Sequence, residues 1–200
     1  MFGWKKWGIL ALVVGASMLT AVKFSTGSPS PTPVSSARYT ADGKLMLPQG
    51  YRSWAFIGST VTPNGLNNGK AGFPEFHNVY IERVNLGAYR KTGVFPEGTV
   101  IVKELALVRN ATHPDGSTDE ASGRGFFEGE LNGLDVTVKD SKKYSETNNW
   151  GFFNFGHHAL PYAESAKEAS AAECAGCHQA GAATTDMTWV QFYPNLRTKN

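Results

Sequence analysis

The pattern of apolar and polar positions along the chain predicts a domain built mainly from β-strands. Segments rich in aromatic and β-branched residues, each bounded by glycine, proline or asparagine, are typical of strands. Strands are expected at residues 51–62, 76–83, 98–108 and 150–155, and residues 125–140 predict either a bent hairpin or two short strands. The polar segments 64–72 and 109–125 predict loops.

Helical patterns are few and gather towards the C-terminus. Residues 85–91 begin with an asparagine that can cap a helix and stop before a glycine, which predicts one short helix. Two further helical segments are expected around residues 164–178 and 185–196. Strands followed by helices predict an α+β fold, mainly an antiparallel β-sheet with a few helices.

The N-terminal segment has the layout of an export signal. Lys5 and Lys6 precede residues 7–22, which carry no charge and are mostly apolar. This run is shorter than the ~20 residues that span a bilayer comfortably, which favours a signal peptide. The end of the run lacks a small-x-small cleavage pattern, which leaves a membrane anchor open. The expected organisation is a signal or anchor at 1–24, a Ser/Pro/Thr-rich linker at 25–40 and one domain at 41–200.

Composition narrows the class of partner. The formal net charge is +2, but three lysines precede the first acid, Asp42, so the remainder carries a net charge of −1. A nearly neutral domain has no electrostatic footprint for nucleic acid. Aromatic residues make up 12% of the chain and charged residues only 18%, against a typical ~25% charged. Such a domain suits a large apolar cofactor.

The strongest motif is Cys174-Ala175-Gly176-Cys177-His178, the C-x-x-C-H attachment signature of a c-type haem. Both thiols can form thioethers with the porphyrin, and His178 can bind the iron as axial ligand. On a helix, all three side chains project from one face, so a haem-bearing helix is expected near the C-terminus. A redox dithiol would need a βαβ context and zinc a second pair of ligands, and these are the only two cysteines.

From about residue 45 to 197 the chain resembles the cytochrome P-460 family of ammonia- and methane-oxidising bacteria. The matching stretches are Leu47-Pro48, Tyr51-Arg52-x-Trp54, Val61-Thr62-Pro63-Asn64, Lys91-Thr92-Gly93-x-Phe95, Gly98-Thr99-Val100-x-Val102-Lys103-Glu104-Leu105, Val138-Lys139-Asp140-Ser141, Asn149-Trp150-x-Phe152-Phe153 and Thr185-Asp186-Met187. The resemblance implies a dimeric, β-rich periplasmic cytochrome with a five-coordinate haem. It also implies oxidation of hydroxylamine to nitrous oxide, with a soluble cytochrome c as electron acceptor.

The resemblance implies that Lys103 forms an extra covalent bond to the porphyrin. Strand alternation places Lys103 on one face with Ile101 and Leu105, and Glu104 on the other. Both faces are otherwise apolar, so this strand is expected to be buried and both charges need an explanation. Alternatively, Lys103 extends to the end of the strand or pairs with Glu104 or another acid.

Two further residues are candidates for the open side of the haem. By resemblance, Asp135 is a carboxylate that accepts protons released from hydroxylamine, as a general base. Alternation groups Asp135 with Thr137, away from Val136, so the pattern alone indicates an ordinary solvent-facing aspartate. His77 is a candidate proton shuttle or hydrogen-bond donor in the same pocket, or else an exposed strand histidine.

Two competing functions stay open. A nitric oxide-binding cytochrome of the related c-prime-beta type would share the fold and the late haem motif but lack the lysine bond. A plain electron carrier would need a second axial ligand, for which His157 and His158 are candidates. Phenylalanines that are candidates for pocket walls, or else for general core, are Phe73, Phe76, Phe152, Phe153 and Phe155.

Overall fold

The structure is a computed structural model that describes residues 1, 3 and 35–197. The chain divides near residue 30, and the sheet, the helices and the haem motif all belong to the unit Pro31–Asn200. Apart from residues 1 and 3, the predicted signal or anchor lies outside the described residues, as does most of the linker. Within the described part, no helix is both long and apolar enough to cross a bilayer.

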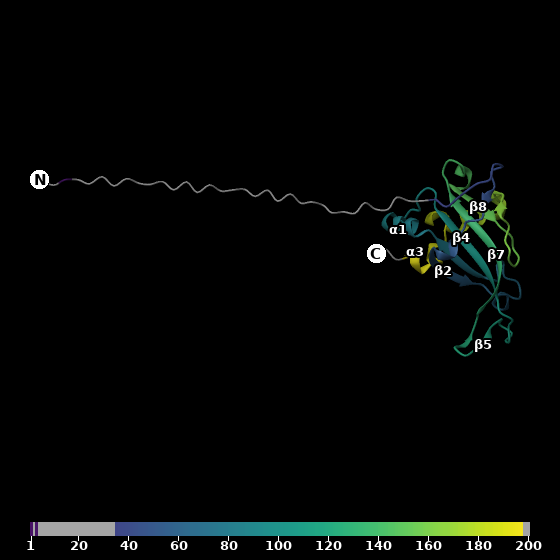
Figure 1. The fold of residues 1–200 in the computed structure, drawn as a ribbon. Helices are drawn as coiled ribbons and strands as arrows, with labels where there is room; N and C mark the ends of the chain where they lie inside the picture. Colours follow the sequence, from purple (N-terminus) through teal and green to yellow (C-terminus); the bar gives the residue numbers. More distant parts are fainter. Residues whose placement is uncertain (2, 4–34, 198–200) are drawn as a thin grey trace. The chain divides into compact units, whose positions relative to one another are not determined.

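A five-stranded antiparallel sheet forms the centre of the domain (Figure 1). Its strand order is β2 (Ala55–Val61), β3 (Phe76–Ile81), β4 (Val100–Val108), β7 (Glu128–Lys139) and β8 (Trp150–Asn154). A two-stranded sheet pairs β1 (Leu45–Met46) with β9 (Ser165–Ala166). The predicted α+β class with a mainly antiparallel sheet is confirmed.

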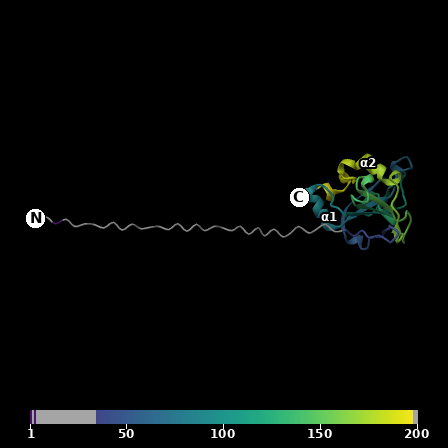
Figure 2. The same ribbon diagram turned by 90° about the horizontal axis from the view of Figure 1, so that it is seen from above.

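Short helical elements complete the fold. The α-helices are α1 (Arg83–Thr92), α2 (Gly176–Ala182) and α3 (Pro194–Arg197), and η4 (Ala171–Ala175) is a π-helix. The 3₁₀ turns are η1 (Tyr51–Ser53), η2 (Asn64–Leu66), η3 (Ser145–Thr147), η5 (Ala183–Thr185) and η6 (Val190–Phe192). Figure 2 shows α1 and α2 outside the sheet.

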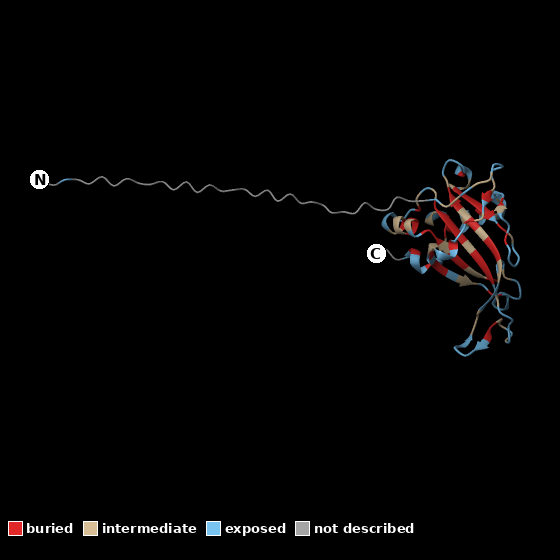
Figure 3. Ribbon diagram, in the orientation of Figure 1, coloured by how far each residue is buried: buried red, intermediate tan, exposed pale blue. Residues whose placement is uncertain are grey.

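The sheet separates two apolar cores, as the alternation along β4 predicts. Ile101 belongs to the helix-side core, which also contains residues of α1 and of the C-terminal helical segments. Val100 and Val102 belong to the opposite core, with residues of β7, β8, β1 and β9. Most residues of β4 are buried, and red predominates along the middle strands in Figure 3. The prediction that this strand is buried on both faces is therefore confirmed.

Several predicted elements differ from the structure. Residues 125–140 contain one long strand, β7, instead of a hairpin or two short strands. Glycine weakens a strand locally, but β7 continues with a bulge at Asn132, where Gly133 pairs with Leu105 and Leu131 pairs with Ala106. The predicted loop 109–125 contains a hairpin of β5 (Thr118–Glu120) and β6 (Gly123–Gly125), which projects beyond the sheet (Figures 1 and 3).

The C-terminal helices are shorter than predicted. The segment 164–178 becomes helical only at Ala171, because Ser165 and Ala166 pair with β1 instead. The segment 185–196 is not one helix, because Asp186 and Met187 both have positive φ angles, which right-handed helices exclude. A helical segment does run from 171 to 185, so the predicted helix around the C-x-x-C-H motif is present.

Candidate haem site

The C-x-x-C-H motif spans a π-helix and the α-helix that follows it. Glu173 accepts hydrogen bonds at 2.7 Å from both the backbone N–H and the hydroxyl of Ser170, and so caps the first turn. Cys174 lies in η4 and is half-buried, whereas Cys177 lies in α2 and is exposed. Both thiols are free to form thioether bonds.

The His178 imidazole is fixed from three sides. Its Nδ1 donates a hydrogen bond of 2.7 Å to the Met187 carbonyl, which leaves Nε2 unprotonated and able to bind a metal. The ring centroid lies 4.6 Å from Phe152 and 4.3 Å from Trp189. Burial lowers the pKa of His178, and the charge of Lys103 adds to this against the opposing hydrogen bond to Met187. A neutral imidazole is the form that binds metals.

Lys103 and Asp135 lie directly opposite each other on β4 and β7. Lys103 Nζ is 2.9 Å from Asp135 Oδ2, and Asn154 on β8 donates a hydrogen bond of 2.7 Å to Oδ1. Lys103 therefore pairs with an acid across the sheet and not with Glu104, whose partner is Arg52. The Asp135 side chain is 23% exposed, and both Lys103 and the Asn154 amide contact its carboxylate.

Lys103 and Asp135 share their surroundings with the haem motif. Burial raises the pKa of the Cys174 thiol, and the charge of Asp135 raises it further while that of Lys103 lowers it. The same two charges act on His178. Lys103 Nζ also lies 4.6 Å from the centre of the Phe73 ring, a cation–π contact. The sequence-predicted residues Lys103, Asp135, Cys174 and His178 are thus brought to one face of the sheet.

His77 occupies the next position along this face, paired with Leu105 in the sheet. Burial lowers the pKa of His77 to about 4, and the charge of Lys103 contributes to the shift. The ring stands edge-on to Phe73 at a centroid distance of 5.8 Å. Its Nε2 is buried and has no hydrogen-bond partner in the protein, which among the described residues is true of only one other side-chain atom, Glu75 Oε2. His77 is therefore neutral at pH 7, and its buried Nε2 has no hydrogen-bond partner among the described residues.

Glu75 is a residue that sequence reasoning missed. Its carboxylate is buried and lies 2.6 Å from His157 Nε2 and 3.2 Å from Asn132 Nδ2. Burial alone would raise the pKa of Glu75, but these contacts and a backbone hydrogen bond together lower it. A single acid before a strand gives no signal for such a role. His157, a candidate second axial ligand, is engaged by Glu75, and His158 Nδ1 bonds the Ala159 carbonyl.

The predicted aromatic walls fall on different sides of the sheet. Phe152 lies in the helix-side core and touches His178. Phe153 and Phe155 are buried in the opposite core, so they do not form walls of the candidate haem pocket. Phe73 is 47% exposed and covers Lys103 and His77.

The fold and the site together define a cytochrome whose haem-attachment helix packs against a β-sheet. The chain belongs to the Cytochrome P460 family, whose model matches residues 48–190. The family implies a c-type haem and fits a haem oxidoreductase in general. A comparison with curated proteins finds no significant match.

The described residues fit such a haem. Two free thiols have the required spacing, and His178 presents an unprotonated ring nitrogen between two aromatic rings. The unpartnered Nε2 of His77 supplies a polar atom on the same face. A c-haem could be held by Cys174, Cys177 and His178.

Proposed function

We propose that this protein is a periplasmic hydroxylamine oxidoreductase of the cytochrome P-460 type. In this proposal Cys174 and Cys177 would attach the haem, His178 would bind its iron, and Lys103 would be bonded to the porphyrin. The observation that carries the proposal is the pairing of Lys103 with Asp135 on the face that His178 also approaches. Hydroxylamine turnover of this type would need a lysine to bond the porphyrin, a carboxylate to accept protons and an imidazole to bind the iron, and this face carries all three.

The haem, when bound, accepts the electrons that leave hydroxylamine. The protein then has to position the ligand and remove protons. Asp135 is the proposed general base, and the Asn154 amide holds its carboxylate in place. A covalent bond from Lys103 to the porphyrin would end its ion pair with Asp135, so the carboxylate would be free to accept a proton. Neutral His77 is the proposed partner in moving protons away from this face.

The test is turnover of hydroxylamine by holoprotein matured in a host that attaches c-haem. D135L removes the base, and we expect activity to fall at least ~100-fold, the low end for general-base catalysis, with the haem spectrum nearly unchanged. D115N removes an acid in the loop before the projecting hairpin and is the matched control, because the Asp115 carboxylate contacts the nearby Ser117 and Arg124. Unchanged turnover in D135L would rule out the role of Asp135.

A second measurement separates the enzyme from a nitric oxide-binding protein. The dithionite-reduced wild type should have a strongly red-shifted Soret band that K103A loses. A normal ferrous c-haem band in the wild type would show that Lys103 is not bonded to the porphyrin. That result, with nitric oxide bound and no turnover, would assign the protein to the c-prime-beta type.

The proposal extends to location and partners. Lys5, Lys6 and the apolar run after them support export, by a signal peptide or an N-terminal anchor, and c-haem is attached outside the cytoplasm. Family resemblance supports a homodimer and a soluble cytochrome c as electron acceptor, and the near-neutral charge gives no support for nucleic acid.

A further inference from the structure

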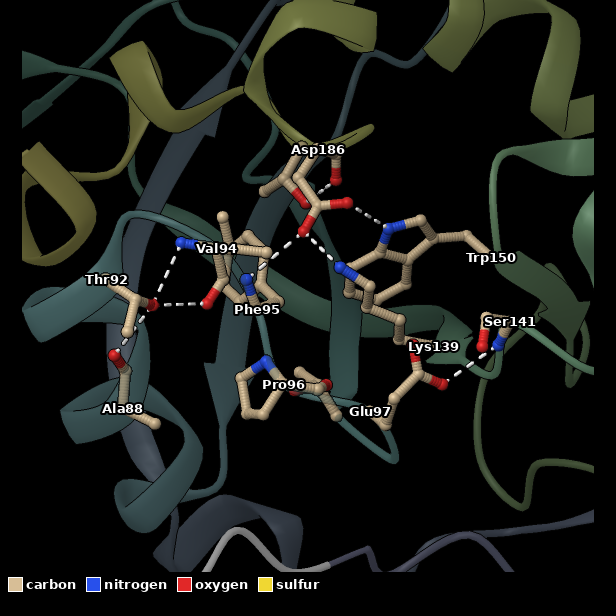
Figure 4. A network of polar contacts seen from close by, with 12 residues as sticks. Ala88, Thr92, Val94, Phe95, Pro96, Glu97, Lys139, Ser141, Trp150 and Asp186 are labelled. Atoms are coloured by element: carbon tan, nitrogen blue, oxygen red, sulfur yellow. Dashed lines mark hydrogen bonds and ion pairs between the residues drawn. The ribbon is translucent and has the colours of Figure 1, made fainter. Parts of the chain in front are cut away.

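The carboxylate of Asp186 receives three donors from three separate parts of the chain (Figure 4). Lys139 Nζ on β7 lies 2.6 Å from Oδ2, and the backbone N–H of Phe95 reaches the same oxygen at 3.1 Å. The Trp150 indole N–H on β8 donates to Oδ1 at 3.0 Å. Lys139 is itself buried, with 7% of its side chain exposed. A buried lysine needs an opposing charge, and Asp186 supplies it.

Asp186 begins an unusual turn. Both Asp186 and Met187 are left-handed, with φ angles of 54° and 59°, a conformation that non-glycine residues rarely adopt twice in succession. Such strain persists only where surrounding contacts impose it. The three donors to Asp186, together with the bond from the Met187 N–H to the Ala182 carbonyl (2.9 Å), supply that constraint.

This turn fixes the position of the Met187 carbonyl group. The Met187 carbonyl, one residue beyond Asp186, accepts the 2.7 Å hydrogen bond from His178 Nδ1. In metal sites such a bond fixes the orientation of the imidazole and raises its basicity as a ligand. Asp186 does not touch His178 in this arrangement. It acts through the backbone that presents the acceptor.

We propose that Asp186 is a positioning residue, which holds the Met187 carbonyl against His178 and so tunes the strength of His178 as the iron ligand. The Asp186 carboxylate is itself held in place by Lys139, Trp150 and the Phe95 amide. The role requires the haem attachment proposed above but not hydroxylamine turnover. Its failure would leave the assignment of the reaction untouched, and failure of the reaction would leave this role untouched.

Two variants test the role in holoprotein. D186N removes the charge but keeps a side chain that tolerates the left-handed conformation. W150F removes one donor to Asp186 without changing any charge and preserves most of the aromatic volume. The readouts are the Fe–His stretching frequency of the ferrous, five-coordinate haem by resonance Raman and the reduction potential. D115N is the control for loss of a paired carboxylate elsewhere.

If Asp186 positions the Met187 carbonyl, both variants lower the Fe–His stretching frequency. A weaker hydrogen bond from Nδ1 makes His178 a less basic ligand to the iron. The reduction potential rises, by up to about a tenfold change in the ferrous-to-ferric ratio for D186N, which is 59 mV for one electron. W150F shifts both readouts in the same direction by less, and D115N shifts neither.

The role is overturned if W150F and D186N keep the wild-type frequency, even where they unfold more easily. A raised potential in D186N with a wild-type frequency in both variants also overturns it, since that pattern is a through-space effect of charge. If D186N does not fold, the charge-neutral W150F decides alone.

Discussion

At the scale of single residues, neighbouring charges on β4 have different tasks. Glu104 points into the opposite core and accepts hydrogen bonds from Tyr51, Arg52 and Tyr162 at 2.5–3.2 Å. Lys103 points to the helix side and pairs with Asp135. Alternation alone predicted that these two side chains lie on opposite faces. It could not identify their partners, because those depend on which residue of the next strand lies opposite.

His77 gives a residue-scale prediction about pH. Its folded-state pKa is about 4, while that of an unfolded histidine is about 6.5. Between these values the unfolded chain binds more protons than the folded one, so this histidine makes stability rise with pH across that window. H77Q should flatten the rise, measured as the free energy of unfolding in urea at several pH values from 4.5 to 7.5.

The charged groups that act on His77 are Lys103, Glu75 and Asp135, and all are retained in H77Q. H158Q is the matched control, because His158 is exposed and should leave the wild-type pH dependence intact. An H77Q curve parallel to that of the wild type would show that His77 titrates normally in the folded protein.

At the scale of elements, the residues that bound each strand indicate most of the strands correctly. The prediction fails where pairing with a neighbouring strand determines the structure of a segment. The segment 98–108 reads clearly because both faces are apolar. Residues 125–140 contain glycines that locally indicate breaks, yet pairing with β4 and β8 carries one strand through them with a bulge at Asn132. That continuous strand places Asp135 opposite Lys103. The ion pair between them therefore could not be predicted from the sequence pattern. The left-handed turn at Asp186 likewise has no local signal.

Two glycines on different elements predict opposite effects of the same substitution. A Cβ at Gly151 on β8 would lie 2.5 Å from the buried Tyr144 ring, so G151A should destabilise by roughly 1–3 kcal/mol through overpacking. A Cβ at Gly87 in α1 would meet nothing within 4 Å, and alanine should stabilise the helix by about 0.5–1 kcal/mol. Urea unfolding of both variants checks the signs, and equal effects would contradict this account of β8 packing.

At the scale of the whole molecule, one sheet serves two purposes, since its helix side carries the candidate haem site and its other side a conventional core. The hydrogen bonds of Glu104 to Tyr51, Arg52 and Tyr162 belong to the side with the conventional core. E104Q should lower the free energy of unfolding by roughly 1.5–3 kcal/mol, because the hydrogen bonds of this buried carboxylate are charge-assisted. The reduced haem spectrum should stay as in the wild type.

E120Q is the control for that prediction, because Glu120 pairs with Arg109 on the exposed hairpin and surface pairs contribute about 0–1 kcal/mol. A shifted haem spectrum in E104Q would mean that the two faces are not independent.

The opposite charges of Lys103 and Glu104 also favour the native register of β4 over a register shifted by one residue. A strand that slips by one residue turns every side chain to the other face. Glu104 would then lie towards Asp135, and Lys103 would be carried towards Arg52, so that like charges met on both sides of the sheet. Val100, Ile101 and Val102 are apolar on either face and would not distinguish the two alignments. The two adjacent charges therefore disfavour a misaligned sheet at a place where the apolar neighbours cannot.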